Sequence, residues 1–138
     1  MPKTRELIGN VQRAFESGDF DRFPELVAPD AEIRNPFTTV RGPHEFAALG
    51  AAFAAAVSER RIEVLDVVEN GSAAIAEIRV TGRHTGAMPL PDGEAPATGN
   101  PISFREAGVV RVRDGRIASW HSYYDMLELA QQLGIAPA

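Results

Sequence analysis

Aspartate and histidine, two side chains suited to proton transfer, stand at the ends of predicted strands. Asp125 follows the last alternating segment, and alternation directs its side chain inward, where apolar surroundings raise the pKa of an unpaired carboxyl. Such a carboxyl can serve as a general acid or base. Asp125 also precedes a helical pattern that starts at Met126, so it can instead cap that helix, and the two roles are compatible.

Three more polar residues are expected in the same region. His84, within Gly82–Gly86, is a second candidate for acid–base catalysis or hydrogen bonding, although a histidine at a strand end often has a structural role. His121 and Tyr123 can orient Asp125 or a substrate oxygen, or simply form part of the inner wall. We therefore predict catalytic roles for Asp125 and His84 and substrate-binding roles for His121 and Tyr123.

Four further residues complete the predicted substrate-binding set. Glu106 is a second inward carboxylate, unless a bulge turns it outward to pair with an arginine such as Arg105. Asn35, next to a proline, can donate a hydrogen bond to a substrate carbonyl or form an Asn-Pro turn. The apolar contacts are assigned to Phe104 on the inner face and to Phe53 on a helix.

Two antiparallel hairpins must position these side chains, because the apolar period changes to two after Arg61. The Asn-Gly and Asp-Gly pairs that separate the alternating segments are strong turn signals. The segments are Ile62–Glu69 and Ser72–Thr81 around Asn70-Gly71, and Ile102–Arg113 and Arg116–Tyr124 around Asp114-Gly115.

In a hairpin with a two-residue turn, the residue numbers of every opposed pair add to the same value, so the residues that share each face of the hairpin can be worked out. One bulge would overturn the assignment. The predicted inner face holds Leu65, Val67, Ala74, Ala76, Ile78, Val80 and His84 in the first hairpin, and Phe104, Glu106, Val110, Val112, Ile117, Ser119, His121, Tyr123 and Asp125 in the second. The predicted outer face holds Arg105, Val109, Arg111, Arg113, Trp120 and Tyr124, and it is expected to contact solvent and a second copy of the chain.

Helical spacing dominates the beginning and the end of the chain. The expected elements are a helix through Leu7, Val11, Ala14 and Phe15 that ends at Gly18, a short helix from Asp19 through Phe23, Leu26 and Val27 that ends at 28–30, extended pieces over 31–40, a helix over 44–57, and a final helix from Met126 that ends at Gly134. Helices followed by long hairpins indicate an α+β fold. We expect a curved antiparallel sheet that forms a cone around the helices, with a cavity at its open end.

The segment Gly82–Pro101 carries four prolines and four glycines and is long for a plain connection. A segment so rich in proline and glycine cannot form an interior strand or a helix. We predict a loop that lies over one end of the sheet and gates the cavity.

Composition limits the chemistry. The 138 residues form a single predicted domain, 1–138, with 44% hydrophobic residues, a net charge of −5 and no cysteine. Absent cysteines exclude disulfides and thiolate sites, and the negative charge argues against nucleic acid and anionic membranes. The three histidines lack compact metal-site spacing, and no phosphate loop follows a strand, so no metal or cofactor is expected.

No segment is apolar enough for a signal peptide or membrane span, which predicts a soluble cytoplasmic protein.

Several motifs resemble the SnoaL-like polyketide cyclase family, within the nuclear transport factor 2-like and ketosteroid isomerase-like superfamily of cone folds. The similar segments cover nearly the whole chain and include 82–86, 96–104, 114–117, 120–125 and 132–134. The resemblance implies cofactor-free ring closure by intramolecular aldol chemistry, with Asp125 as acid/base and His84 in the pocket. The loop over 88–94 is longer and more acidic than the family pattern, which affects the choice of substrate.

The sequence therefore predicts a cofactor-independent acid–base enzyme, a cyclase or isomerase, for a small hydrophobic carbonyl or polyketide-type substrate. One alternative is a non-catalytic module for small-molecule binding or dimerisation. Another is an epoxide hydrolase or hydratase, in which Glu106 would hold water beside Asp125. The cavity distinguishes these hypotheses: a lone desolvated Asp125 favours proton transfer, a solvated carboxylate pair favours hydrolysis, and a cavity filled by side chains favours the module.

Overall fold

The structure is a computed structural model that describes residues 3–90 and 93–135. The predictions for residues 1–2, 91–92 and 136–138, including both ends of the expected domain and part of the expected loop, lie outside the described residues.

The helices occur where the apolar spacing predicts them. They are α1 (Thr4–Ser17), the 3-10 turn η1 (Phe20–Arg22), α2 (Phe23–Leu26), α3 (Gly42–Ala56) and α4 (Met126–Gln132). Helix α1 ends at Gly18 in the left-handed conformation, as expected. Helix α2 is shorter than predicted, because Val27 pairs with Ile117 in the sheet instead of continuing the helix. Asp19 stands at the N-cap of η1, but its side chain makes no capping hydrogen bond.

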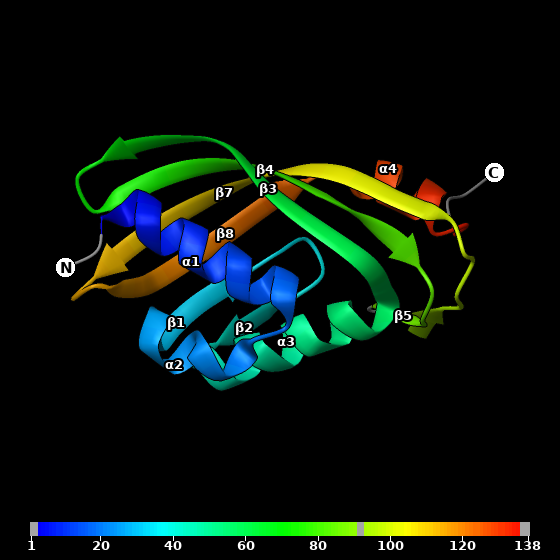
Figure 1. Cartoon of the computed structure of the whole chain (residues 1–138), viewed down its shortest axis with the longest axis horizontal. Helices are drawn as coiled ribbons and strands as arrows, with labels where there is room; N and C mark the ends of the chain where they lie inside the picture. Colours follow the sequence, from blue (N-terminus) through cyan, green and yellow to red (C-terminus); the bar gives the residue numbers. More distant parts are fainter. Residues whose placement is uncertain (1–2, 91–92, 136–138) are drawn as a thin grey trace.

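The main sheet has six strands in the order β2-β1-β8-β7-β4-β3. Its strands are β1 (Val27–Arg34), β2 (Thr39–Arg41), β3 (Val57–Asn70), β4 (Ala73–His84), β7 (Pro101–Arg113) and β8 (Arg116–Tyr124). All neighbouring pairs are antiparallel except β1 with β8, which form an unpredicted parallel pair. Figure 1 shows the long strands curving over α1, α2 and α3, while α4 lies at the end of the sheet remote from the N-terminus.

The segment predicted as a loop over one end of the sheet contains a separate two-stranded sheet, β5 (Met88–Leu90) paired with β6 (Gly93–Ala95). It lies at the same end of the main sheet as α4 (Figure 1). Met88 and Ala95 are buried, so this segment packs on the domain.

The first hairpin keeps the predicted inner face of β4 although its turn is displaced by one residue. Asn70 pairs with Ala73, so the turn residues are Gly71 and Ser72. Residues 73–77 of β4 therefore meet partners two residues further along β3 than predicted, and a shift of two preserves the face. Further along, a bulge between Val64 and Asp66 leaves Leu65 unpaired and exposed, so its predicted inward position is wrong.

The second hairpin reverses the predicted faces of β8. Its Asp114-Gly115 turn has the positive φ angles of the expected type, and Val112 pairs with Ile117 as predicted. A bulge then leaves Ala118 without a partner, because the next pair is Arg111 with Ser119. The extra residue inverts the rest of the strand. The inward residues are Trp120, Ser122 and Tyr124, and the predicted inward residues His121, Tyr123 and Asp125 lie elsewhere.

The helices pack on the concave side of the sheet through aromatic rings. Phe15 of α1 contacts Phe46 and Phe53 of α3, with ring centroids 5.9 and 6.0 Å apart. Phe23 of α2 lies 4.7 Å from Phe46 and is fully buried. These contacts hold α3 beneath the sheet and form one end of the cavity described below.

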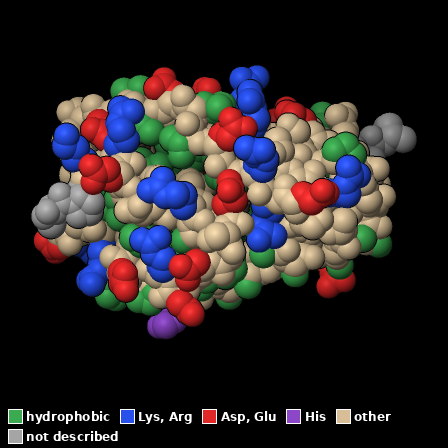
Figure 2. Space-filling view, viewed as in Figure 1, with side chains coloured by type: hydrophobic (Ala, Val, Ile, Leu, Met, Phe, Trp, Pro, Cys, Tyr) green, Lys and Arg blue, Asp and Glu red, His purple; other side chains and the backbone are tan. Residues whose placement is uncertain are grey.

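Charged residues of both signs lie close together on the face seen in Figure 2, which carries α1 and α3. No large patch of one sign covers this face. None of the described helices has both the length and the apolar composition that a bilayer crossing requires.

Candidate active site

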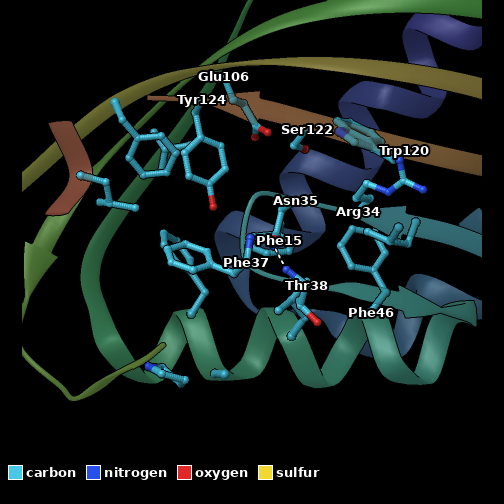
Figure 3. Close-up of a pocket in the computed structure, with 18 of the residues that line it drawn as sticks. Phe15, Arg34, Asn35, Phe37, Thr38, Phe46, Glu106, Trp120, Ser122 and Tyr124 are labelled. Carbon is cyan, nitrogen blue, oxygen red and sulfur yellow. Dashed lines mark hydrogen bonds between the residues drawn. The ribbon is translucent and has the colours of Figure 1, made fainter. Parts of the chain in front are cut away.

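A cavity of about 380 Å³ lies between the concave face of the sheet and helices α1 and α3 (Figure 3). Its walls are mainly aromatic and aliphatic, and its polar groups are few. The aromatic side chains come from Phe15, Phe37, Phe46, Phe53, Phe104, Trp120 and Tyr124, and the other polar residues are Gln12, Arg34, Asn35, Thr38, Glu106 and Ser122. An apolar chamber with a few polar groups is typical of a small-molecule site.

Glu106 is the one carboxylate among the described residues that line the cavity. It extends from β7 into the chamber beside Ser122 of β8 (Figure 3). Burial raises the pKa of Glu106 above its usual value of 4.5, and a hydrogen bond to the Ser122 side chain offsets part of this increase. A carboxyl with a raised pKa in an apolar chamber is suited to exchange protons with a bound molecule.

Tyr124 is the cross-strand partner of Glu106 and presents its hydroxyl group to the same cavity (Figure 3). Its ring packs between Phe104 and Phe37, with centroid distances of 5.0 and 6.3 Å. Burial raises the pKa of Tyr124, and the negative charge of Glu106 raises it further. The phenol therefore keeps its proton and can donate a hydrogen bond to a ligand oxygen.

Trp120 forms part of the cavity wall and is only 3% exposed, so its predicted position on the outer face is wrong. Its indole lies against Gly108 of the neighbouring strand. A β-carbon at position 108 would lie 2.5 Å from Nε1 of the indole, so glycine at this position makes room for the ring.

Four of the predicted substrate-binding residues line the cavity: Glu106, Asn35, Phe104 and Phe53. They come from β7, the β1–β2 turn and α3, which the fold brings together. Their roles in binding stay predictions. Asn35 also forms the predicted turn, because its Oδ1 accepts hydrogen bonds from the backbone N–H groups of Phe37 and Thr38.

Asp125 does not line the cavity, and its predicted inward orientation is wrong. It is exposed at the N-cap of α4, where its Oδ1 accepts hydrogen bonds from the backbone N–H groups of Leu127 and Glu128 at 3.0 and 3.1 Å. The capping role predicted as the alternative is confirmed. A catalytic role for Asp125 stays a prediction.

His84 is fully buried on the inner face, as predicted, but it does not line the cavity. Its Nδ1 lies 3.0 Å from Oγ1 of Thr98, and its backbone exchanges hydrogen bonds with Gly99 and Asn100. These contacts join the end of β4 to the segment before β7. The geometry favours a structural role, and catalysis by His84 stays a prediction.

His121 and Tyr123 lie on the outer face, contrary to their predicted positions. Nε2 of His121 lies 2.9 Å from Oε1 of Glu32, which also pairs with Arg34 and Arg41 at 3.1 Å. The hydrogen bond from His121 and the charges of the two arginines lower the pKa of Glu32. Tyr123 is 57% exposed. Neither His121 nor Tyr123 borders the cavity.

Tyr124, Ser122 and Gln12 line the cavity although they were not predicted to do so. The first two were missed because the bulge at Ala118 reverses β8. One signal was available: the large apolar ring of Trp120 is better buried than exposed, and burying it requires such a bulge. Gln12 is 8% exposed and comes from α1, where a polar residue on the apolar side of the helix was a second signal. The described residues contain no group of three or more side chains placed to hold a metal ion.

A curved, mostly antiparallel sheet wrapped around helices and an apolar cavity defines the cone-shaped α+β class, as predicted. The model of the SnoaL-like domain matches residues 10–120. The chain therefore belongs to the SnoaL-like family, and the resemblance noted in the sequence is confirmed.

Two curated relatives are aklanonic acid methyl ester cyclases from Streptomyces. DnrD of Streptomyces peucetius is 30% identical over 135 residues, covering 94% of this chain and 89% of DnrD. DauD of Streptomyces sp. (strain C5) is also 30% identical over 135 residues, covering 94% of this chain and 80% of DauD. The relatives of this chain thus include cyclases.

Solved structures show the same fold. TsrD from Streptomyces laurentii has a TM-score of 0.82 and 26% identity, with 95% of this chain and 94% of TsrD covered. A protein with a ketosteroid isomerase-like fold from Catenulispora acidiphila has a TM-score of 0.78 and 19% identity, with 98% and 96% covered. The predicted ketosteroid isomerase-like architecture is confirmed.

Proposed function

We propose that this protein is a cofactor-independent cyclase that closes a ring in a hydrophobic, polyketide-type carbonyl compound by intramolecular aldol addition. The observation that carries the proposal is the pair formed by Glu106 and Tyr124, a carboxyl with a raised pKa and a protonated phenol facing one aromatic cavity. The two cyclase relatives support the same class of reaction.

Glu106 acts as the base and later as the acid. Its carboxylate removes a proton from the carbon next to a carbonyl group, and the electron pair of that C–H bond forms the enolate. The enolate carbon then attacks a second carbonyl carbon of the same molecule, and the proton held by Glu106 goes to the new alkoxide. One C–H bond and the π bond of the attacked carbonyl are replaced by one C–C and one O–H bond, so the substrate and product are isomers.

Tyr124 stabilises the enolate oxygen. Its hydroxyl donates a hydrogen bond to the oxygen on which negative charge develops, and a donor fixed in an apolar site is worth more than one in water. The packing of its ring between Phe104 and Phe37 holds the donor in position before the substrate arrives.

The shape and charge of the site favour this reaction over the alternatives. Glu106 stands without a second carboxylate among the described cavity residues, whereas water addition to an epoxide or alkene would need two. The chamber is also open, whereas a module that kept only the fold would have a filled cavity.

Aklanonic acid methyl ester, named for the two relatives, is the first substrate to test. The purified protein is incubated with this ester, and the products are separated by liquid chromatography and weighed by mass spectrometry. We expect a new compound of unchanged mass, formed by the wild type and not by Glu106→Gln. A product about 18 mass units heavier would indicate that water has been added, as in hydrolysis of an epoxide or hydration of an alkene. An active Glu106→Gln variant would rule out Glu106 as the base.

A further inference from the structure

Asn35 occupies the turn between β1 and β2, and the turn uses only half of its side-chain amide. Oδ1 accepts the backbone N–H groups of Phe37 at 2.8 Å and Thr38 at 2.9 Å, and the backbone N–H of Asn35 donates to the carbonyl of Thr38 at 2.9 Å. Because two N–H donors face the same side-chain atom, that atom must be the oxygen and not the nitrogen. The orientation of the amide is therefore fixed.

The other half of the amide is available to a ligand. Nδ2 of Asn35 has no hydrogen-bond acceptor within the described part of the chain. Asn35 lines the same cavity as Glu106 and Tyr124, and Figure 3 shows the three side chains within one chamber between the sheet and α3. An N–H donor held in one position by its own turn requires little reorganisation when it binds an oxygen atom.

The aldol reaction proposed above involves two carbonyl groups, and each develops negative charge at a different moment. The Tyr124 hydroxyl can donate a hydrogen bond to the oxygen of the carbonyl that becomes the enolate. We propose that Nδ2 of Asn35 binds the oxygen of the second carbonyl, the one whose carbon is attacked. The substrate class is therefore a compound with two carbonyl groups, of which one is held by Tyr124 and one by Asn35. This inference rests on the proposed function and deepens it.

Substitution of Asn35 by aspartate separates the donor from the turn. A carboxylate oxygen of Asp can accept the same two backbone N–H groups, so Asn35→Asp keeps the turn and replaces only the donating nitrogen with an acceptor. Asn35→Ala removes both functions and serves as the control for the turn. A thermal unfolding curve for each variant reports whether the fold is retained.

Two ketones of matched length serve as probes. They are 1-phenylhexane-1,5-dione, which carries two carbonyl groups, and 1-phenylhexan-1-one, which lacks the second. Binding of each is measured by titration calorimetry with the wild type, Asn35→Asp and Glu106→Gln. We expect the wild type to bind the diketone about tenfold more tightly than the monoketone, a difference equivalent to one well-placed hydrogen bond.

Asn35→Asp should lose this preference while its unfolding temperature stays that of the wild type. A preference retained by Asn35→Asp, or a wild type that does not distinguish the two ketones, would overturn the inference. Glu106→Gln should keep the preference, because glutamine removes proton transfer and leaves Asn35 intact. Proton transfer by Glu106 tests the proposed function, whereas the binding preference for the diketone tests the role of Asn35, so failure of one claim is distinguishable from failure of the other.

Discussion

Glu106 on β7 and Tyr124 on β8 are directly opposed in the antiparallel ladder, and both side chains face the cavity. This pairing couples their charges: an ionised Glu106 disfavours ionisation of Tyr124 and so keeps the phenol protonated. One strand thus supplies the group that takes up and returns the proton, and its neighbour supplies a hydrogen-bond donor.

Tyr124→Phe should lower turnover by roughly 10²-fold, because it removes one donor to a developing oxyanion and leaves the ring in place. Thermal stability should change little, since the contacts with Phe104 and Phe37 remain. The neighbouring tyrosine provides the control: Tyr123 is 57% exposed on the outer face, and Tyr123→Phe should have normal turnover. Equal losses for the two variants would contradict the role given to Tyr124.

The raised pKa of Glu106 predicts the pH dependence of catalysis. The base must be ionised, so kcat/KM should fall as the pH falls through the pKa of Glu106 in the folded protein. Because burial raises this pKa above 4.5, the decline should begin at a higher pH than for an ordinary glutamate. A profile that stays flat down to the usual pKa of a glutamate would argue against Glu106 as the base.

The same shift predicts how stability depends on pH. The folded state binds the Glu106 proton more tightly than the unfolded state, so this residue contributes a loss of stability as the pH rises from 4.5 through the raised folded pKa. Glu106→Gln lacks this contribution and should be more stable than the wild type at neutral pH. Urea unfolding at acidic and neutral pH should show the difference shrinking in acid.

The fold could be predicted from the sequence because its signals are local. Gly18 ends α1, and the Asp114-Gly115 pair makes the expected turn. The inner face of the cavity was harder to predict, because one unpaired residue at Ala118 reverses β8, and the main sign of this bulge in the sequence is the preference of the Trp120 ring for burial. Glu106 lies on β7, which contains no extra residue in this ladder, and its side chain points inward as predicted. Asp125 follows the bulge in β8, and its side chain does not.

The capping role of Asp125 predicts a contrast between two substitutions. Asp125→Ala removes the acceptor for Leu127 and Glu128 and should cost about 1 kcal/mol of stability, whereas Asp125→Asn should cost much less because asparagine is also a good N-cap. Chemical unfolding of both variants measures the contrast. Equal stability of the two would mean that the cap contributes nothing.

The predicted dimer now rests on different residues, because Trp120 and Tyr124 face inward. Adjacent strands place Ile75 opposite Val109 on the outer face, and Tyr123 lies nearby on β8. Ile75 is 52% exposed, and we expect a second copy of the chain to cover this face. Ile75→Glu should then convert a dimer to a monomer in light scattering without loss of fold. A monomeric wild type would refute the prediction.

Proton abstraction by Glu106 is the central claim, and hydrogen–deuterium exchange measures it without knowledge of the natural substrate. 1-Phenylhexan-1-one is incubated in deuterated buffer with each protein, and nuclear magnetic resonance follows the loss of the protons next to the carbonyl. We predict that the wild type and Asp125→Asn accelerate exchange equally and that Glu106→Gln is slower by at least roughly 10²-fold. Normal exchange by Glu106→Gln, with exchange lost in a folded Asp125→Asn, would contradict the account and return the catalytic role to Asp125.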